Sequence, residues 1–193
     1  MVIAILICIF AYFCGSLPFS LWVSKMHGVD LRAVGSGNLG ATNVYRALGL
    51  RWAVVVFVCD MVKSYVPTVL SMALFPMHPF FHVVVGFVAI LGHSLSLWVH
   101  FKGGRGAASG MGVLLAISPP IFGIMLAIAV GLILTVRIVS VATLVDCILA
   151  PILFYELHYP VAYTVTIGAV CLFIIVRHKA DIMRLIQGKE NRI

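Results

Sequence analysis

The chain has 193 residues, of which 63% are hydrophobic and only 10% are charged. A soluble domain of this length cannot bury so much apolar surface, because ordinary soluble domains contain about 25% charged residues. The net charge of +7 does not indicate nucleic-acid binding, because the cations lie between long apolar runs, which is typical of a membrane protein. The length allows a single integral-membrane domain over residues 1–193.

The first apolar run begins at the N-terminus. Residues 1–13 lack the basic residues that open a secretory signal, so we expect a retained first helix whose N-terminus lies outside the cytoplasm. A crossing helix needs about 20 residues to span a hydrocarbon core of about 30 Å. On that basis we expect crossings over residues 2–24, 52–75, 80–99, 140–157 and 160–176.

A glycine-rich loop over residues 35–46 follows the first helix. Its sequence, GSGNLGATNVYR, suits a backbone that takes positive φ and approaches a ligand closely. Successive N–H groups in such a turn form an anion-binding nest, which predicts phosphate-binding roles for Gly37 and Gly40. Thr42 and Asn43 are expected to cap the following helix, with Arg46 one turn further along. A plain flexible connector is the alternative interpretation.

Two charges interrupt the apolar run over 52–75. Asp60 and Lys63 are spaced i,i+3, which places them on the same face of a helix. Charges inside a membrane are costly and often functional, but a mutually satisfied pair is an equally good interpretation.

A second glycine loop, KGGRGAAS, covers residues 102–109. By itself, a basic glycine loop at a membrane face is often only a topology signal. Beside the first loop it predicts a second phosphate-binding segment, formed by Lys102, Gly103, Gly104, Arg105 and Gly106.

The stretch over 107–136 is too long for one crossing and short for two. Consecutive prolines in Ser118-Pro119-Pro120 predict a helix break, and the first half is expected to begin near residue 103. Seven crossings then place every Lys and Arg except Lys63 on one side. The predicted fold is therefore an all-α polytopic membrane protein with seven transmembrane helices, its N-terminus outside and its C-terminus cytoplasmic.

Helices 2, 4 and 6 of this arrangement have their N-termini in the cytoplasm, where unpaired N–H groups favour anions. Ser140 is expected to be the N-cap of helix 6, and His178 near the end of helix 7 is a candidate base. Asp146 lies within a span and is a possible partner of Lys63 or Arg137. The other histidines lack ligand spacing and receive no chemical role, with His93 the least certain. All five cysteines lie in apolar runs without metal-ligand spacing, so neither a metal nor another cofactor is expected.

Several motifs occur in an order that resembles the bacterial acyl-phosphate:glycerol-3-phosphate acyltransferases, over essentially the whole chain. They are GSLPF (15–19), GSGNLGATNVYRALG (35–49), DMVKS (60–64), GH (92–93), KGGRGAAS (102–109), RIVSVAT (137–143) and RHKADIMRLIQGKE (177–190). The first two glycine loops are the most specific. Arg105 stands where the family usually has Lys, and Asp181 stands where it usually has Asn, so Asp181 is expected to pair with Lys179 or Arg184.

The resemblance implies an inner-membrane enzyme that transfers a fatty acyl group from acyl phosphate to glycerol 3-phosphate, with an active site on the cytoplasmic face. The products are lysophosphatidate and phosphate, in phospholipid biosynthesis. The implied phosphate-binding residues are Ser36, Asn38, Thr42, Asn43, Arg46, Lys102, Arg105, Ser140 and His178. Of these, Arg46, Lys102, Ser140 and His178 are expected to be catalytic, and a monomer is expected.

An acyl phosphate is an activated mixed anhydride, so the reaction needs no covalent nucleophile, and the chain has no GxSxG motif. We expect catalysis by positioning and charge stabilisation, with the proton passing to His178 or to a substrate phosphate. A small organic-phosphate transporter of the inner membrane is the alternative function. A structural subunit of a lipid-synthesis complex is a third interpretation, which requires the loops to be dispensable.

Overall fold

A computed structural model describes residues 1–193, and all of its regular elements are helices. The helices pack as two compact units, residues 1–117 (unit 1) and residues 118–193 (unit 2). The single-domain expectation remains a prediction.

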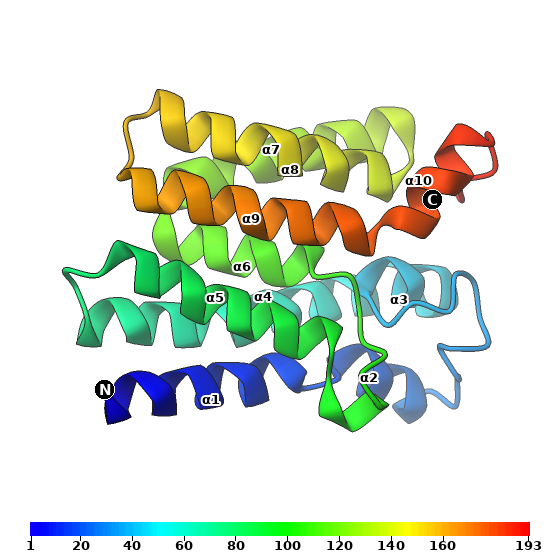
Figure 1. Ribbon diagram of the computed structural model, residues 1–193. Coiled ribbons are helices and arrows are strands. Elements are labelled where there is room, and N and C mark those ends of the chain that lie inside the picture. The colour runs from blue at the N-terminus through cyan, green and yellow to red at the C-terminus, as the bar shows by residue number, and fades with distance from the viewer. The chain divides into compact units, whose positions relative to one another are not determined.

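Unit 1 contains six α-helices and one 3-10 helix (Figure 1). Figure 1 shows that α1, α4, α5 and α6 run in alternating directions, so that residues 27–40 and residues 100–106 lie at the same end of this unit. The elements are α1 (Val2–Ser16), α2 (Phe19–Met26), α3 (Ala41–Leu48), α4 (Leu50–Leu74), α5 (Pro79–Ser94), η1 (Leu97–Val99) and α6 (Ala107–Ile117).

Glycines allow the helices of unit 1 to approach backbone to backbone. A Cβ on Gly15 of α1 would overlap the Ala89 carbonyl of α5, and a Cβ on Gly92 of α5 would overlap the Tyr12 carbonyl of α1. A Cβ on Gly112 of α6 would likewise overlap a carbonyl of α4. Close approach through small residues is a common way of packing helices in a membrane, where lipid removes the hydrophobic driving force between them.

Unit 2 consists of α7 (Pro119–Val136), α8 (Val139–Glu156), α9 (Val161–Arg177) and α10 (Lys179–Ile186). Its core centres on Phe154, which is fully buried and lies against Tyr159 and Tyr163. The chain ends beside the α7–α8 turn, where Ile193 N donates to Arg137 O at 2.9 Å.

The predicted helix break at the prolines is confirmed. Helix α6 ends at Ile117 and α7 begins at Pro119, with Ser118 between them. Pro119 occupies the first helical position, where its missing N–H costs nothing. The Ser118 side chain accepts a hydrogen bond from Ile121 N at 3.3 Å and so caps α7.

Five helical segments are long and apolar enough to cross a membrane: Val2–Met26, Leu50–Leu74, Pro79–Val99, Pro119–Val136 and Val139–Glu156. A sixth arises if α9 and α10, which are bent by 61°, are taken as one span. With 11 residues, α6 is about 16 Å long, roughly half of the hydrocarbon core. The all-helical membrane fold is confirmed, whereas the count of seven crossings and their orientation remain predictions.

Candidate phosphate-binding site

The first glycine loop is shaped by the side chain of Asn43. Its Oδ1 accepts a hydrogen bond from Ser36 N at 3.0 Å, and its Nδ2 donates to Leu31 O and Val34 O, both at 2.9 Å. Both amide hydrogens are thus used, and the side chain is fully buried. Asn43 therefore holds the loop in shape, and its expected contact with a phosphate remains a prediction.

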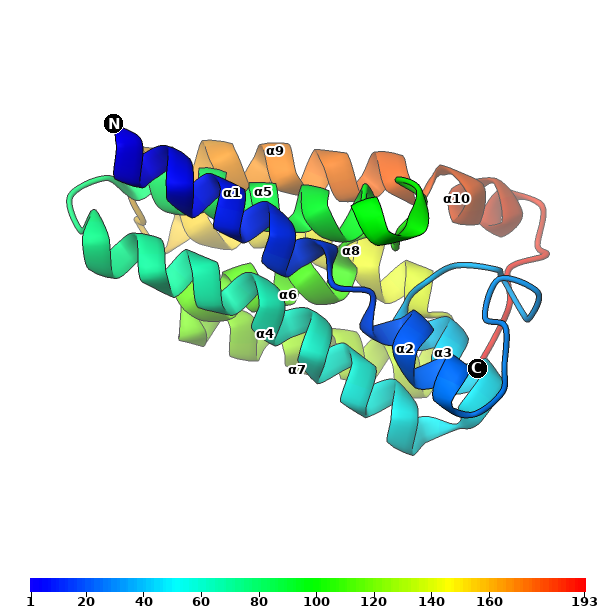
Figure 2. The ribbon, with the colours of Figure 1, turned by 90° about the horizontal axis from the view of Figure 1, so that it is seen from below.

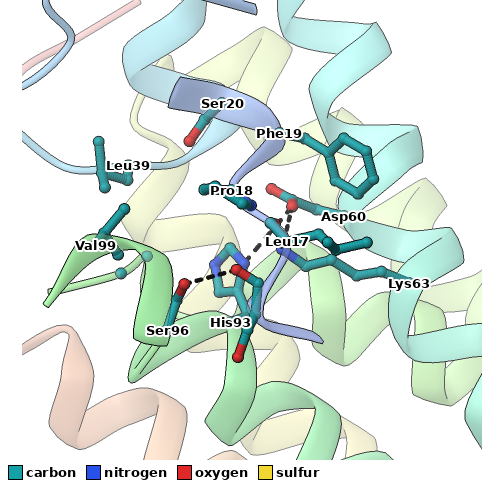
Figure 3. Close-up of a pocket in the computed structure, with 13 residues that line it drawn as sticks. Leu17, Pro18, Phe19, Ser20, Leu39, Asp60, Lys63, His93, Ser96 and Val99 are labelled. Atoms are coloured by element: carbon teal, nitrogen blue, oxygen red, sulfur yellow. Dashed lines mark hydrogen bonds and ion pairs between the residues drawn. The ribbon is translucent and has the colours of Figure 1, made fainter. Parts of the chain in front are cut away.

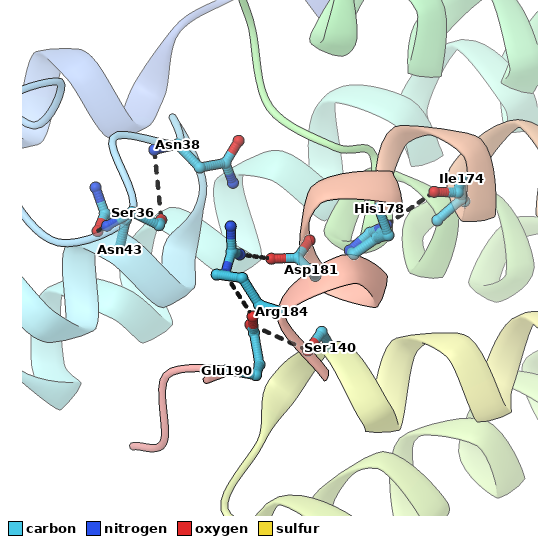
Figure 4. Close-up of polar contacts among 9 residues, drawn as sticks. All are labelled: Ser36, Asn38, Asn43, Ser140, Ile174, His178, Asp181, Arg184 and Glu190. Atoms are coloured by element: carbon cyan, nitrogen blue, oxygen red, sulfur yellow. Dashed lines mark hydrogen bonds and ion pairs between the residues drawn. The ribbon is translucent and has the colours of Figure 1, made fainter. Parts of the chain in front are cut away.

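Positive φ angles at Gly35 (59°) and Gly37 (67°) turn the chain within this loop. These values lie in the left-handed region, which glycine enters without steric cost. The Ser36 hydroxyl accepts a weak hydrogen bond from Asn38 N at 3.4 Å (Figure 4). The loop therefore leaves Ser36 and Asn38 half-buried at one end of unit 1.

The expected caps after this loop are wrong. Gly40, in extended conformation, is the N-cap of α3, and Thr42 and Asn43 lie inside α3 without capping it. The loop also does not lead directly into a membrane helix, because α3 intervenes and α4 begins only at Leu50. Asn43 cannot cap the helix because its carboxamide is bound to the loop that precedes it. Arg46 lies in the last turn of α3.

The second glycine loop is non-helical and is bound to the end of α5. Gly103 N donates to Ser94 O at 3.0 Å, and Gly104 N donates to His93 O at 3.2 Å. Because these amides bind α5, the chain is not helical until Ala107, and the expected helix start near residue 103 is wrong. Lys102 is exposed and Arg105 half-buried, while Gly106 has φ 95°.

The two loops meet at Gly104. A Cβ on this residue would overlap His93 Nε2 and would lie 2.9 Å from Leu39 O of the first loop. Only glycine fits here without displacing one of them. The structure of unit 1 thus brings together the two segments that the sequence assigned to phosphate.

A small pocket, with room for about one water molecule and partly open to solvent, lies beneath this meeting point. Figure 3 shows a buried cluster of polar side chains facing it. Leu39, Asp60, Lys63, His93, Gly103 and Gly104 are among its lining residues.

Asp60 and Lys63 form the mutual pair that their spacing allowed. Lys63 Nζ lies 2.6 Å from Asp60 Oδ1, and it also donates to Leu17 O at 2.9 Å. His93 Nδ1 lies 3.6 Å from the same carboxylate oxygen. The sequence gave His93 no role and did not predict the contact with Leu17, because both partners are remote in the chain. The sequence signals for these two contacts were the GSLPF motif, which contains Leu17, and the GH motif, which contains His93.

In unit 2, the expected N-cap at Ser140 is wrong, because Ile138 is the N-cap of α8. The Ser140 hydroxyl instead donates to Glu190 Oε1 at 3.2 Å (Figure 4). Arg184 binds the carboxylates of both Glu190 and Asp181. This confirms the expected pairing of Asp181 with Arg184, which belongs to the same helix, α10.

His178 lies between α9 and α10 and is buried, with 4% of its surface exposed. Its Nδ1 is 2.8 Å from Ile174 O. A carbonyl oxygen only accepts, so Nδ1 carries the hydrogen, and Nε2 is the basic atom of the neutral ring.

Asp146 lies half-buried in α8, and its Oδ1 has no hydrogen-bond partner. Lys63, one of its expected partners, is paired with Asp60. Of the predicted site residues, only Ser140 and His178 belong to unit 2; the others lie in the two loops of unit 1 and in α3.

Apolar helices of membrane length define an integral membrane protein, and in it two basic glycine loops meet above a small polar pocket. The family model for glycerol-3-phosphate acyltransferase matches residues 5–188. The chain belongs to the glycerol-3-phosphate acyltransferase family, which confirms the resemblance seen in the sequence.

Relatives with this name align over nearly the full chain. A glycerol-3-phosphate acyltransferase from Aquifex aeolicus is 38% identical over 189 residues, covering 98% of each chain. One from Fusobacterium nucleatum is 38% identical over 188 residues, covering 95% of each chain.

Two crystal structures of PlsY (YgiH), an integral membrane glycerol 3-phosphate acyltransferase, are also similar. Its glycerol 3-phosphate form has a TM-score of 0.94 and 37% identity, covering 98% of this chain and 95% of that one. Its lysophosphatidic acid form has a TM-score of 0.92 and 36% identity, with the same coverage.

Proposed function

We propose that this protein transfers a fatty acyl group from acyl phosphate to glycerol 3-phosphate, which yields lysophosphatidate and inorganic phosphate in phospholipid biosynthesis. The reaction takes place at the cytoplasmic face of the bacterial inner membrane, and the enzyme acts as a monomer. The similar crystal structures, a glycerol 3-phosphate form and a lysophosphatidic acid form of PlsY, support this acceptor and this product.

The observation that carries the proposal is the meeting of the two glycine loops at Gly104 in unit 1. Both substrates carry a phosphate, and each loop has a neighbouring cation. Arg46 follows the first loop, and Lys102 and Arg105 belong to the second. Such cations bind phosphate through charge-assisted hydrogen bonds.

In the proposed reaction, the glycerol hydroxyl attacks the acyl carbonyl carbon, the new ester C–O bond forms, and the C–O bond to phosphate breaks. Arg46 and Lys102 stabilise the charge that develops on the reacting groups, and Ser140 and His178 complete the site. The hydroxyl proton passes to His178 Nε2 or to a substrate phosphate.

These two routes for the proton predict different pH profiles for His178→Ala. If His178 is the base, the variant loses the limb of the kcat/KM profile that its deprotonation produces in the wild type. A variant that keeps the wild-type profile assigns the proton to a substrate phosphate. Rate measurements between pH 5 and 9 with the purified enzyme distinguish them.

A seven-helix topology with a cytoplasmic C-terminus is part of the proposal. Helix α6 alone is too short to span, and the non-helical residues 102–106 precede it. Non-helical backbone at membrane depth is tolerated where protein covers it or where it lines a cavity. Gly103 and Gly104 meet this condition, since their amides bind α5.

A product assay with the purified protein in detergent tests the function. Glycerol 3-phosphate is supplied with acyl phosphate, acyl-CoA or acyl carrier protein as the donor, and lysophosphatidate is measured. We expect product with acyl phosphate alone. Product with only another donor would refute the proposed donor, and absence of product with all three would favour the organic-phosphate transporter.

A further inference from the structure

Three polar residues lie beneath the glycine loops without a role in the proposed reaction. The exposed fractions are 2% for Asp60, 6% for Lys63 and 7% for His93. Burying two charges and an imidazole inside membrane helices is unfavourable unless the groups are well paired. Lys63 and His93 each contact a different segment of backbone, and the Asp60 carboxylate lies against both side chains.

Lys63 binds the break between α1 and α2. Figure 2 shows the non-helical step between these helices, at Leu17 and Pro18. Carbonyls in the last turn of a helix lack partners within the helix. Lys63 Nζ donates to Leu17 O at 2.9 Å, and Ser96 Oγ donates to Ser16 O at 2.6 Å. Helix α2 starts from this break and leads into the first glycine loop. Lys63 therefore holds the point from which α2 and the loop extend.

His93 supports the second loop. Its carbonyl accepts the hydrogen bond of Gly104 N, and its ring lies so close to Gly104 that Nε2 occupies the space of a Cβ. On the other side of the ring, Nδ1 faces Asp60 Oδ1 at 3.6 Å. The carboxylate of Asp60 thus lies between Lys63, which holds the α1–α2 break, and His93, which supports the second loop (Figure 3).

We propose that Asp60, Lys63 and His93 form a positioning group that fixes the spacing of the two glycine loops and thereby sets the affinity for phosphorylated substrates without contacting them. The loops meet where Gly104 approaches Leu39 O. A displacement of either Lys63 or His93 therefore changes the position of one loop relative to the other. The identity of these substrates rests on the proposed function, but the effect on the loops does not.

Variants of the full-length protein test this role. Lys63→Met and Asp60→Asn each remove one charge, the double variant removes both, and His93→Gln alters the contact with Gly104 while keeping the ion pair. Ser71→Ala is the matched control, because Ser71 is also buried in α4, donates only to Thr68 O within its own helix, and lies far along the helix from the loops.

Three measurements are made in detergent: hydrogen–deuterium exchange, binding of inorganic phosphate by calorimetry, and steady-state kinetics. In the variants of the group, we expect faster exchange in residues 35–40 and 100–106. We also expect about tenfold weaker phosphate binding and about a tenfold higher KM for glycerol 3-phosphate, with a smaller change in kcat, because loops that bind ground state and transition state alike act on KM. The control should match the wild type in all three.

A folded double variant with wild-type exchange in both loops and wild-type phosphate affinity would overturn the proposal. If the charge-removing variants do not fold, His93→Gln decides, and unchanged exchange over residues 100–106 then refutes the role of His93. A wild-type protein that makes no lysophosphatidate refutes the proposed function instead, while the exchange measurements still test the positioning group.

Discussion

Replacing Gly104 by alanine is expected to impair turnover far more than folding. The added Cβ would overlap His93 Nε2 and lie 2.8 Å from Cε1 of the same ring and 2.9 Å from Leu39 O. The His93 ring is held against Asp60 and the Leu39 carbonyl belongs to the backbone, so neither is easily displaced. The second glycine loop itself must therefore move. Restoring ordinary contact distances requires a shift of about 1 Å, and overpacking of this kind costs about 1–3 kcal/mol.

A misplacement of about 1 Å can reduce a rate about 100-fold when the displaced groups position a substrate. We therefore expect kcat/KM for glycerol 3-phosphate to fall about 100-fold, with only a modest loss of thermal stability. Gly123→Ala in α7 is the control, because nothing lies within 4 Å of the position of its Cβ, and alanine stabilises a helix interior by about 1 kcal/mol relative to glycine. Wild-type kcat/KM in folded Gly104→Ala would refute the reasoning.

Four further substitutions test other parts of the structure. Asn43→Ala removes three hydrogen bonds and should destabilise the protein by about 2–4 kcal/mol at roughly 1 kcal/mol each, measured by thermal unfolding; an unchanged midpoint contradicts its role in the loop. Gly112→Ala pushes α6 away from an α4 carbonyl and should cost about 1–3 kcal/mol in the same assay. Arg46→Ala and Lys102→Ala should each lower kcat/KM about 100-fold, whereas Lys25→Ala, an exposed cation at the end of α2, should not; equal effects of all three would refute specific phosphate binding.

Local sequence signals predicted the helix break at the prolines, the pairing of Asp60 with Lys63 and positive φ in the first loop. Pro119 and Pro120 ended one helix and began the next because their effect on the backbone is local. Asp60 and Lys63 paired because the i,i+3 spacing alone brings their side chains together. Glycine at positions 35 and 37 indicated positive φ for the same reason.

Long-range contacts could not be predicted in this way. Thr42 and Asn43 were expected to cap a helix, but Asn43 binds Leu31 O and Val34 O instead, and several acceptors compete for such a carboxamide. The end of α5 binds the second loop and so delays the start of α6 to Ala107. Ser140 was read as a cap from its position alone, whereas its partner Glu190 is 50 residues away.

The ion pair inside α4 also has a consequence for biogenesis. Asp or Lys at the centre of an inserting helix costs about 2.5–3.5 kcal/mol, and α4 carries one of each. The acceptor of the Lys63 ammonium, Leu17 O, belongs to α1 and has already been synthesised when α4 emerges from the ribosome. His93 follows only with α5. The order of the chain thus gives the ammonium both a neighbouring carboxylate and a waiting carbonyl while α4 enters the bilayer.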